Sequence, residues 1–348
     1  MIKFTNPQVS KHKSMKNENK KSTTIIHIII IGILVLIILA FIKKIMDDAR
    51  ETPDSIPQGI EFEKETNNQE KPEELEESEE PEEPEEAEET KAPVSYINPE
   101  GMTAQNRVNT PEDYSRVEAT SGSFLEFTRN LELKEDKSPV LLYDGNEKRN
   151  QTAQVAVYAF DVGSSDLQQC ADSIMRVYSE YYWEKQAYEN IEFHLTNGFL
   201  MDYTNWRDGK RIQVDGNNVS WVNTASYDDS YENFRKYLTQ VMVYAGTLSL
   251  DNESSSIEIE DLKPGDMIIK GGSPGHCVLI VDEAENEDGD SCYLLAQGYM
   301  PAQEFHILKN PQKEDCPWYF EEDLRGSIQT PEYPFDESEI KRWNKGFD

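Results

Sequence analysis

Hydrophobic and polar positions divide this chain into regions of different character. Residues 25–42, IIHIIIIGILVLIILAFI, are apolar except for His27, and eighteen such residues are about the shortest run that spans a hydrocarbon core. Residues 43–110 contain few large apolar side chains. From residue 111 onward, apolar positions recur at the spacings of strands and helices. We therefore predict a polar tail over 1–24, a transmembrane helix over 25–42, a linker over 43–110 and one domain over 111–348.

Two amphipathic helices are predicted within this domain. Ser164-Ser165-Asp166 is an N-cap signal for the segment DLQQCADSIMRVYSEYYWEKQ, in which apolar residues recur every three to four positions. This spacing places Cys170 on the first or second turn, facing inward. Residues 230–245, SYENFRKYLTQVMVYA, have the same periodicity and predict a second helix.

Short apolar runs between turn residues predict antiparallel strands. The expected strands are residues 154–160, 191–198 paired with 199–203, 267–269, 277–281 and 292–297, with a turn over 206–211. Helices combined with hairpins predict an α+β fold, in which a helix packs on an antiparallel sheet.

The charge of −33 is unevenly distributed. Residues 1–46 hold eight lysines and one glutamate, whereas residues 47–90 hold twenty acids and three bases. The Glu- and Pro-rich stretch EKPEELEESEEPEEPEEAEETKAP predicts a disordered, self-repelling tether, with capture of calcium or a cationic polymer as the alternative. So acidic a protein disfavours nucleic acid as a partner.

The basic tail also predicts an orientation in the membrane. Six lysines precede residues 25–42, which places the N-terminus in the cytoplasm and the domain outside the cell. Lys43 and Lys44 stand where a cleaved signal peptide would have small residues, so a single-pass anchor is favoured over cleavage. The expected partners are the membrane and a peptide, glycan or protein of the cell envelope.

Three residues form a candidate catalytic set. His276 follows the turn GGSPG and begins an apolar strand, and Cys170 lies near a helix N-terminus, where the helix dipole favours a thiolate. Gln297 ends the next predicted strand. Pairing counted from the loop places either Gln297 or Gly298 opposite His276, and only the first register puts Gln297 and His276 on the same face. These residues suggest a nucleophile, a base and an orienting amide. The alternatives are a core cysteine, a histidine bonded to the turn and a strand-end amide.

A second hypothesis is a binding module without catalysis. Trp206, Arg207 and Arg211 cluster in an otherwise acidic domain and, with Tyr299, are candidates to bind a sugar ring or a carboxylate. Alternatively, the cluster fastens a hairpin by local ion pairs and ring packing.

The sequence predicts neither a metal site nor a cofactor. The histidines lack ligand spacing, and the cysteines form no Cys-x-x-Cys pair. The acidic stretch 282–289 fails the calcium-loop pattern because Ala284 occupies the first ligand position. Strand geometry disfavours a disulfide between Cys277 and Cys292, and other pairings stay open.

Several blocks resemble an uncharacterised bacterial family of secreted or membrane-anchored proteins, defined only as a domain of unknown function. They are DLQQCAD around Cys170, YAGTLSL at 244–250, residues 271–282, LAQ at 295–297 with YMPAQ at 299–303, and PWY at 317–319. The order Cys170, His276, Gln297 also resembles papain-like bacterial cell-wall peptidases and amidases. That resemblance implies a papain-like core and a thiol hydrolase acting on peptide or amide bonds.

Overall fold

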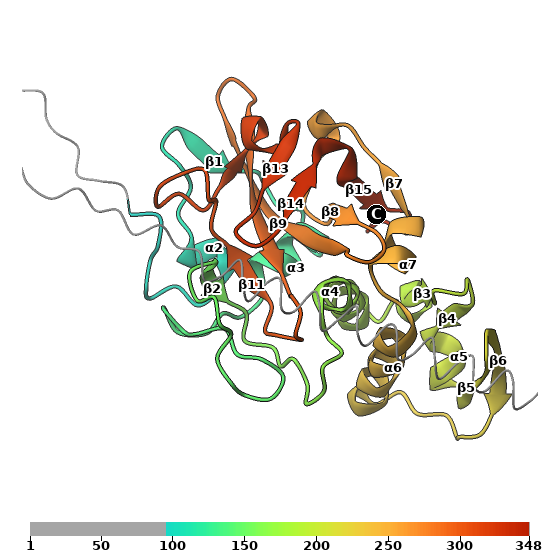
Figure 1. The fold of residues 1–348 in the computed structure, drawn as a ribbon. Coiled ribbons are helices and arrows are strands. Elements are labelled where there is room, and N and C mark those ends of the chain that lie inside the picture. Colours follow the sequence, from blue (N-terminus) through green and yellow to red (C-terminus); the bar gives the residue numbers. More distant parts are fainter. Residues whose placement is uncertain (1–94, 348) are drawn as a thin grey trace, which may run out of the picture. The chain divides into compact units, whose positions relative to one another are not determined.

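The computed structural model describes residues 95–347, a mixture of helices and antiparallel strands (Figure 1). Its α-helices are α2 (Ala104–Arg107), α3 (Phe124–Asn130), α4 (Cys170–Glu184), α5 (Tyr203–Arg207), α6 (Tyr231–Tyr244) and α7 (Thr247–Asn252). Its strands are β1 (Tyr114–Arg116), β2 (Gln154–Val157), β3 (Glu192–His194), β4 (Leu200–Asp202), β5 (Lys210–Asp215), β6 (Asn218–Asn223), β7 (Ser254–Ser256), β8 (Met267–Lys270), β9 (His276–Asn286), β10 (Ser291–Gln297), β11 (His306–Leu308), β12 (Tyr319–Phe320), β13 (Ser327–Gln329), β14 (Pro334–Asp336) and β15 (Ile340–Trp343). This arrangement confirms the predicted α+β class.

A nine-stranded sheet organises the domain. Its main order is β2-β11-β10-β9-β8-β15-β7, with β1 added beside β9 and β12 beside β10. The longest strand, β9, is buried on both faces: Cys277 and Leu279 face one hydrophobic core, and Val278 and Ile280 face a second. Burial on both sides explains why this strand reads as a continuous apolar run.

Helix α4 packs against the first face of β9. Almost the entire helix is buried, and the hydroxyl of Tyr178 donates a 2.8 Å hydrogen bond to the carbonyl of Gly265 before β8. The ring of Tyr178 also stacks on Trp343 of β15, with centroids 4.9 Å apart. Both contacts come from Tyr178 in the middle of the helix, and they fix α4 relative to the residues before β8 and to β15.

The remaining elements include two small hairpins. β3 pairs with β4 and β5 with β6, and Figure 1 shows them beside α5 and α6. The predicted helix over 230–245 is confirmed as α6, whose N-cap is Ser230: its hydroxyl accepts a hydrogen bond from the backbone of Asn233. The turn predicted over 206–211 is present but shorter, since it comprises only Asp208 and Gly209. Residues 203–207 form α5, whose N-cap Asp202 accepts a hydrogen bond from the backbone of Asn205, and β5 begins at Lys210.

Two predicted boundaries also differ from the structure. Residues 95–110, expected as linker, include α2 and a β-bridge between Ile97 and Val108, so the folded part begins earlier than residue 111. Arg107 anchors this segment, donating a 2.7 Å hydrogen bond to the carbonyl of Gly101. A hydropathy pattern does not reveal hydrogen bonds of this kind between buried polar groups. The helix predicted around residue 166 instead begins at Cys170.

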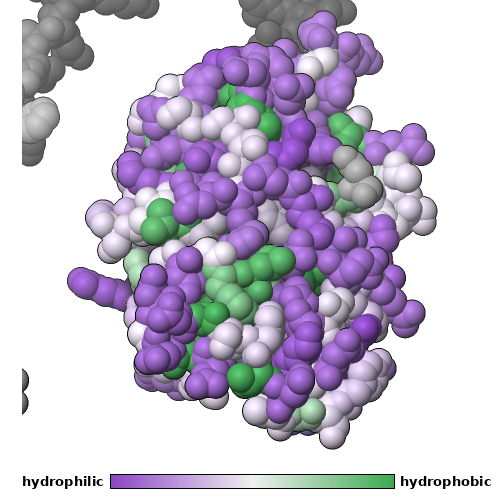
Figure 2. Space-filling view, turned by 90° about the vertical axis from the view of Figure 1, so that its right-hand side faces the viewer, coloured by the Kyte–Doolittle hydropathy of each residue, from purple (hydrophilic) through white to green (hydrophobic). Residues whose placement is uncertain are grey.

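The predicted transmembrane segment, residues 25–42, lies outside the described residues, as does most of the acidic linker. Within residues 95–347, no helix combines the length and apolar character that a membrane crossing requires. Figure 2 shows that hydrophilic residues cover most of one face of the domain, interrupted by smaller hydrophobic patches.

Candidate functional site

Cys170 is the first residue of α4. The preceding residue, Gln169, is extended, and its carbonyl accepts the helical hydrogen bond from the backbone of Ser173 at 3.0 Å. The carboxylate of Asp172 caps the turn by accepting a 3.1 Å hydrogen bond from the backbone N–H of Gln169. Cys170 therefore lies at the end of the helix where free N–H groups and the positive end of the helix dipole are found.

A glycine lets the sheet approach this helix terminus closely. Gly298 directly follows β10, and a Cβ atom at this position would collide with the hydroxyl of Ser173 and lie 3.0 Å from the carbonyl of Gln169. Any larger residue would therefore push the end of β10 away from α4. The glycine brings Gln297 and the start of β9 next to Cys170.

A β-bulge decides which face Gln297 occupies. Near the hairpin, Cys292 pairs with Ala284, but after a register shift between Leu294 and Leu295, Ala296 pairs with Leu279. Continuing the shifted register places Gln297 opposite Val278, so neither predicted pairing with His276 is correct, but Gln297 is on the same face as His276. Without the bulge, Gln297 would lie opposite Leu279 and face the other core.

His276 and Gln297 form a buried hydrogen bond. Nε2 of His276 lies 2.7 Å from Oε1 of Gln297, and both side chains are almost fully buried. The rings of Tyr299, Tyr333 and Phe335 surround the imidazole, with centroid separations of 4.7, 5.2 and 5.7 Å. The aromatic rings limit the movement of the imidazole. Its hydrogen bond with the Gln297 amide then fixes the orientation of the ring.

A carboxylate fixes the orientation of that amide. Nε2 of Gln297 donates a 2.8 Å hydrogen bond to Oε2 of Glu332, so Oε1 is left to accept from His276. Nε2 of His276 therefore carries a proton, and the other ring nitrogen, Nδ1, is the atom available to a thiol.

Lys148 and His306 complete this buried network. Lys148 Nζ donates to Glu332 at 2.5 Å and lies 3.3 Å from Nε2 of His306. Burial and the adjacent lysine lower the pKa of His306 to about 3, so this imidazole is neutral. Its Nδ1 donates to the carbonyl of Glu304, at 2.8 Å, which leaves Nε2 as an acceptor. Lys148, rather than His306, therefore supplies the positive charge that contacts Glu332.

The surroundings of Cys170 favour its thiolate. A hydrogen bond from the Cys277 thiol, together with the hydrogen bond and charge of His276 and the backbone N–H of Ala171, holds the pKa of Cys170 well below its usual range, although burial opposes this. Complete burial raises the pKa of Cys277, which stays a thiol and a donor. All four cysteines are free.

Cys170 opens into a pocket of about 330 Å³. The pocket lies between the start of α4, residues 245–247 before and at the start of α7, and the turn 272–275, with Met242 and Met300 at its sides. Its acidic lining residues are Asp166 and Asp172, and no basic side chain of the described residues lines it. Cys170 is only 5% exposed, but it is one of the residues that line this pocket.

The predicted binding residues are divided between two places. Trp206, Arg207 and Arg211 lie together on α5 and β5, where the guanidinium of Arg211 covers the Trp206 ring at 4.0 Å. Trp206 is 6% exposed and donates its indole N–H to Oδ1 of Asn233 at 2.9 Å. Tyr299 instead contacts His276. The structure thus brings Cys170, His276, Gln297 and Tyr299 together and leaves the other three apart from them.

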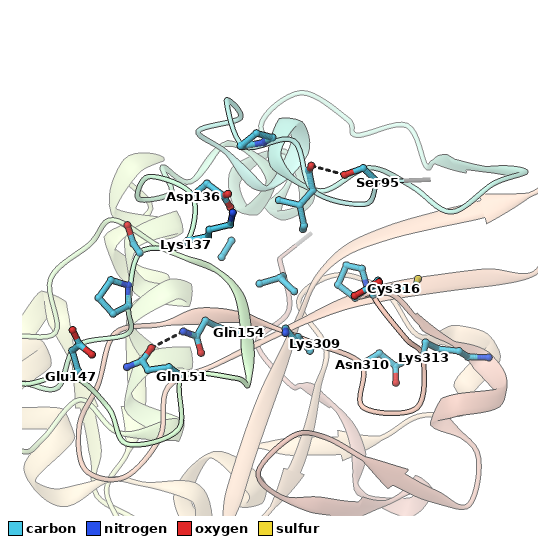
Figure 3. Close-up of a pocket in the computed structure, with 18 residues that line it drawn as sticks. Ser95, Asp136, Lys137, Glu147, Gln151, Gln154, Lys309, Asn310, Lys313 and Cys316 are labelled. Carbon is cyan, nitrogen blue, oxygen red and sulfur yellow. Dashed lines mark hydrogen bonds between the residues drawn. The ribbon is translucent and has the colours of Figure 1, made fainter. Parts of the chain in front are cut away.

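A larger cavity, of about 890 Å³, lies at the edge of the sheet. It is bounded by residues 95–99, the loop 136–139, strand β2 and residues 309–317, and Figure 3 shows Lys309 and Gln154 lining it. The lining combines three lysines with three acids and includes no histidine. This cavity lacks a nucleophile paired with a base, so we place the candidate chemistry in the smaller pocket. Among residues 95–347, no cluster of three or more potential metal ligands occurs.

Comparison with known families gives one match. Residues 104–342 match the family described as Domain of unknown function (4846). The chain belongs to this family. No curated protein and no solved structure shows significant similarity.

Membership confirms the resemblance to an uncharacterised family. The matched region runs from α2 to β15 and includes Cys170, His276 and Gln297. It leaves out residues 25–42 and the Glu-rich stretch.

Four further residues of the site are not predicted from the sequence: Asp172, Glu332 and the aromatic pair Tyr333 and Phe335. The latter three lie some 35 or more residues beyond Gln297, and no spacing links them to it. Asp172 carried a signal, because an acid at the third position of a helix is a common capping residue. That signal was assigned to Asp166, whose Oδ1 instead accepts a 2.7 Å hydrogen bond from the backbone of Ala302.

Proposed function

We propose that this protein is a thiol hydrolase that cleaves peptide or amide bonds of the cell envelope. The supporting observation is the depressed pKa of Cys170, at a helix N-terminus, beside a histidine whose Nε2 is held by Gln297. An ordinary core cysteine would have a raised pKa, as Cys277 and Cys292 do. A low thiol pKa together with an oriented imidazole is the requirement for nucleophilic catalysis by cysteine.

The reaction follows from these positions. The Cys170 thiolate attacks the carbonyl carbon, and the carbonyl oxygen becomes negative near the N-terminus of α4. The His276 imidazolium then gives a proton to the leaving nitrogen, the C–N bond breaks, and a thioester remains. Neutral His276 next takes a proton from water, and the resulting hydroxide attacks the thioester. The C–S bond breaks, the acid product is released, and the thiolate–imidazolium pair is regenerated.

The envelope is the proposed setting because of the apolar run 25–42 and the lysines before it. The pocket is consistent with a neutral or cationic substrate, since Asp166 lines it and no basic side chain from the described part of the chain does. Anionic substrates would be repelled by both the pocket and the net charge.

The pH dependence of Cys170 alkylation tests this proposal. Full-length protein is treated with iodoacetamide from about pH 4 to 10, and peptide mass spectrometry follows modification at Cys170. Because only the thiolate reacts, the rate should reach its plateau well below the free-thiol pKa of about 8.5. His276→Ala removes the favourable charge and hydrogen bond, so the midpoint should move upward.

Two results would contradict the hydrolase. One is an unchanged midpoint in His276→Ala, and the other is a Cys170 that reacts only after unfolding. In the second case the protein is better described as a binding module, and loss of cell-wall fragment binding in Trp206→Ala would support it.

The Gln297 amide should affect catalysis through His276. Gln297→Ala is expected to lower the rate at which p-nitrophenyl acetate acylates Cys170 on the order of 10²-fold, because the imidazole loses its fixed tautomer. The exposed Gln329, on β13, provides the control variant Gln329→Ala. Equal acylation rates in the two variants would show that Gln297 does not orient His276.

A further inference from the structure

Asp172 presents an unused polar atom at the candidate site. Its side chain is on the first turn of α4, two residues after Cys170, and it is 6% exposed. Oδ2 accepts a 3.1 Å hydrogen bond from the backbone of Gln169, whereas Oδ1 has no partner among the residues that the structure describes. Asp172 lines the same pocket as Cys170. A buried polar atom without a partner is unfavourable unless a ligand or reaction intermediate uses it.

The surroundings decide which protonation state Asp172 adopts. Burial, followed by the negative charge of Cys170, holds the pKa of Asp172 well above its usual range. Oδ2 accepts from a backbone N–H, so the proton of the neutral acid belongs on Oδ1. An ionised Asp172 would place a second negative charge beside the thiolate. A neutral Asp172 instead supplies a hydrogen-bond donor to the pocket.

We propose that Asp172 is a catalytic residue that donates the Oδ1 proton in a hydrogen bond to the substrate oxyanion. This inference rests on the proposed thiol hydrolase. Attack by Cys170 moves negative charge onto the substrate oxygen beside the N-terminus of α4, and an unpartnered donor on the first turn can reach such an oxygen. The covalent steps do not change, and Asp172 keeps its proton throughout.

The unpartnered Oδ1 of Asp172 is less well explained by binding of a substrate cation than by binding of an oxyanion. A cation there would meet the positive end of the α4 dipole, whereas an oxyanion is stabilised by it. The neutral acid also has no charge to attract a cation. The observations on burial, position and the unpartnered Oδ1 therefore favour a developing anion.

Two reactions of Cys170 distinguish this role from a structural one. Acylation by p-nitrophenyl acetate passes through an oxyanion, whereas alkylation by iodoacetamide does not. Both rates are measured on full-length wild type, Asp172→Ala and Asp172→Asn, with Glu184→Ala, an exposed acid of the same helix, as the control. We expect Asp172→Ala to lower acylation on the order of 10²-fold and to change alkylation less than about threefold.

Asp172→Asn should restore most of the acylation rate, since asparagine keeps both an acceptor for Gln169 and a donor. An Asn variant as slow as the Ala variant, or equal losses of acylation and alkylation in Asp172→Ala, would overturn the role of Asp172. If wild-type Cys170 reacts with neither reagent in the folded protein, the thiol hydrolase itself fails.

A spectroscopic measurement keeps the inference testable if Asp172→Ala does not fold. The infrared difference spectrum between wild type and Asp172→Asn at neutral pH should contain the carbonyl stretch of a protonated carboxyl group. The band should come from wild type and should be missing in the difference between wild type and Glu184→Ala. Its absence from the first spectrum would show that Asp172 is ionised, which would overturn the inference.

Discussion

Cys170→Ser is expected to reduce acylation by p-nitrophenyl acetate by at least about 10³-fold while leaving the unfolding transition close to that of wild type. Serine is nearly isosteric with cysteine, so the packing at the start of α4 is retained. The environment that depresses the thiol pKa does not ionise a hydroxyl, whose intrinsic pKa is far higher. The variant therefore removes the nucleophile without opening a cavity.

The control for this variant is Cys316→Ser. Cys316 is also buried, but it lines the larger cavity, and the pKa of its thiol is raised by burial. We expect this variant to acylate like wild type. Similar acylation rates in wild type, Cys170→Ser and Cys316→Ser would mean that the reagent reacts elsewhere and that Cys170 is not the nucleophile.

Asp282→Ala is expected to lower the free energy of unfolding by about 3–5 kcal/mol. Asp282 is completely buried in β9, and its carboxylate accepts hydrogen bonds from Nε of Arg129 at 2.6 Å and Nε of Arg116 at 2.7 Å. The guanidinium of Arg129 is itself buried. Removing the carboxylate leaves two guanidinium groups in or near the core with backbone carbonyls as acceptors but without the negative charge of Asp282.

Urea unfolding of the full-length protein, followed by tryptophan fluorescence, measures this loss. Asp288→Ala is the matched control, because Asp288 is an exposed acid in the turn that follows β9. The control should unfold within about 0.5 kcal/mol of wild type. A loss below about 1 kcal/mol for Asp282→Ala would mean that solvent reaches the arginines when the carboxylate is removed.

The acidic pattern in the sequence does not show that Asp282 is buried. In the sequence it begins the acidic stretch 282–289, whose spacing of acids does not match a calcium-binding loop. In the structure β9 continues to Asn286, and the two arginines come from β1 and α3, more than 150 residues away in sequence. Charge density alone does not distinguish a solvated acid from a buried one, because the difference depends on distant partners.

The sequence by itself determined the local elements and the candidate pair. Helical periodicity indicated α4 and α6, and turn residues indicated the β8–β9–β10 succession and the β3–β4 hairpin, because these signals act within about a dozen residues. It also supplied Cys170 near a helix start, His276 at a strand start and the family resemblance. Local chemistry was enough for these conclusions.

Only the tertiary structure decided how the site is assembled. The bulge in β9 places Gln297 on the face of His276, Gly298 lets the sheet reach α4, and Glu332 orients the amide. The start of α4 at Cys170 depends on a capping hydrogen bond that Asp172 accepts from the backbone of Gln169. Several nearby polar residues are equally suited to cap a helix, so the sequence alone does not fix its first residue. Register, close approach and protonation state arise from contacts between distant segments, and these are set by packing and burial rather than by local preference.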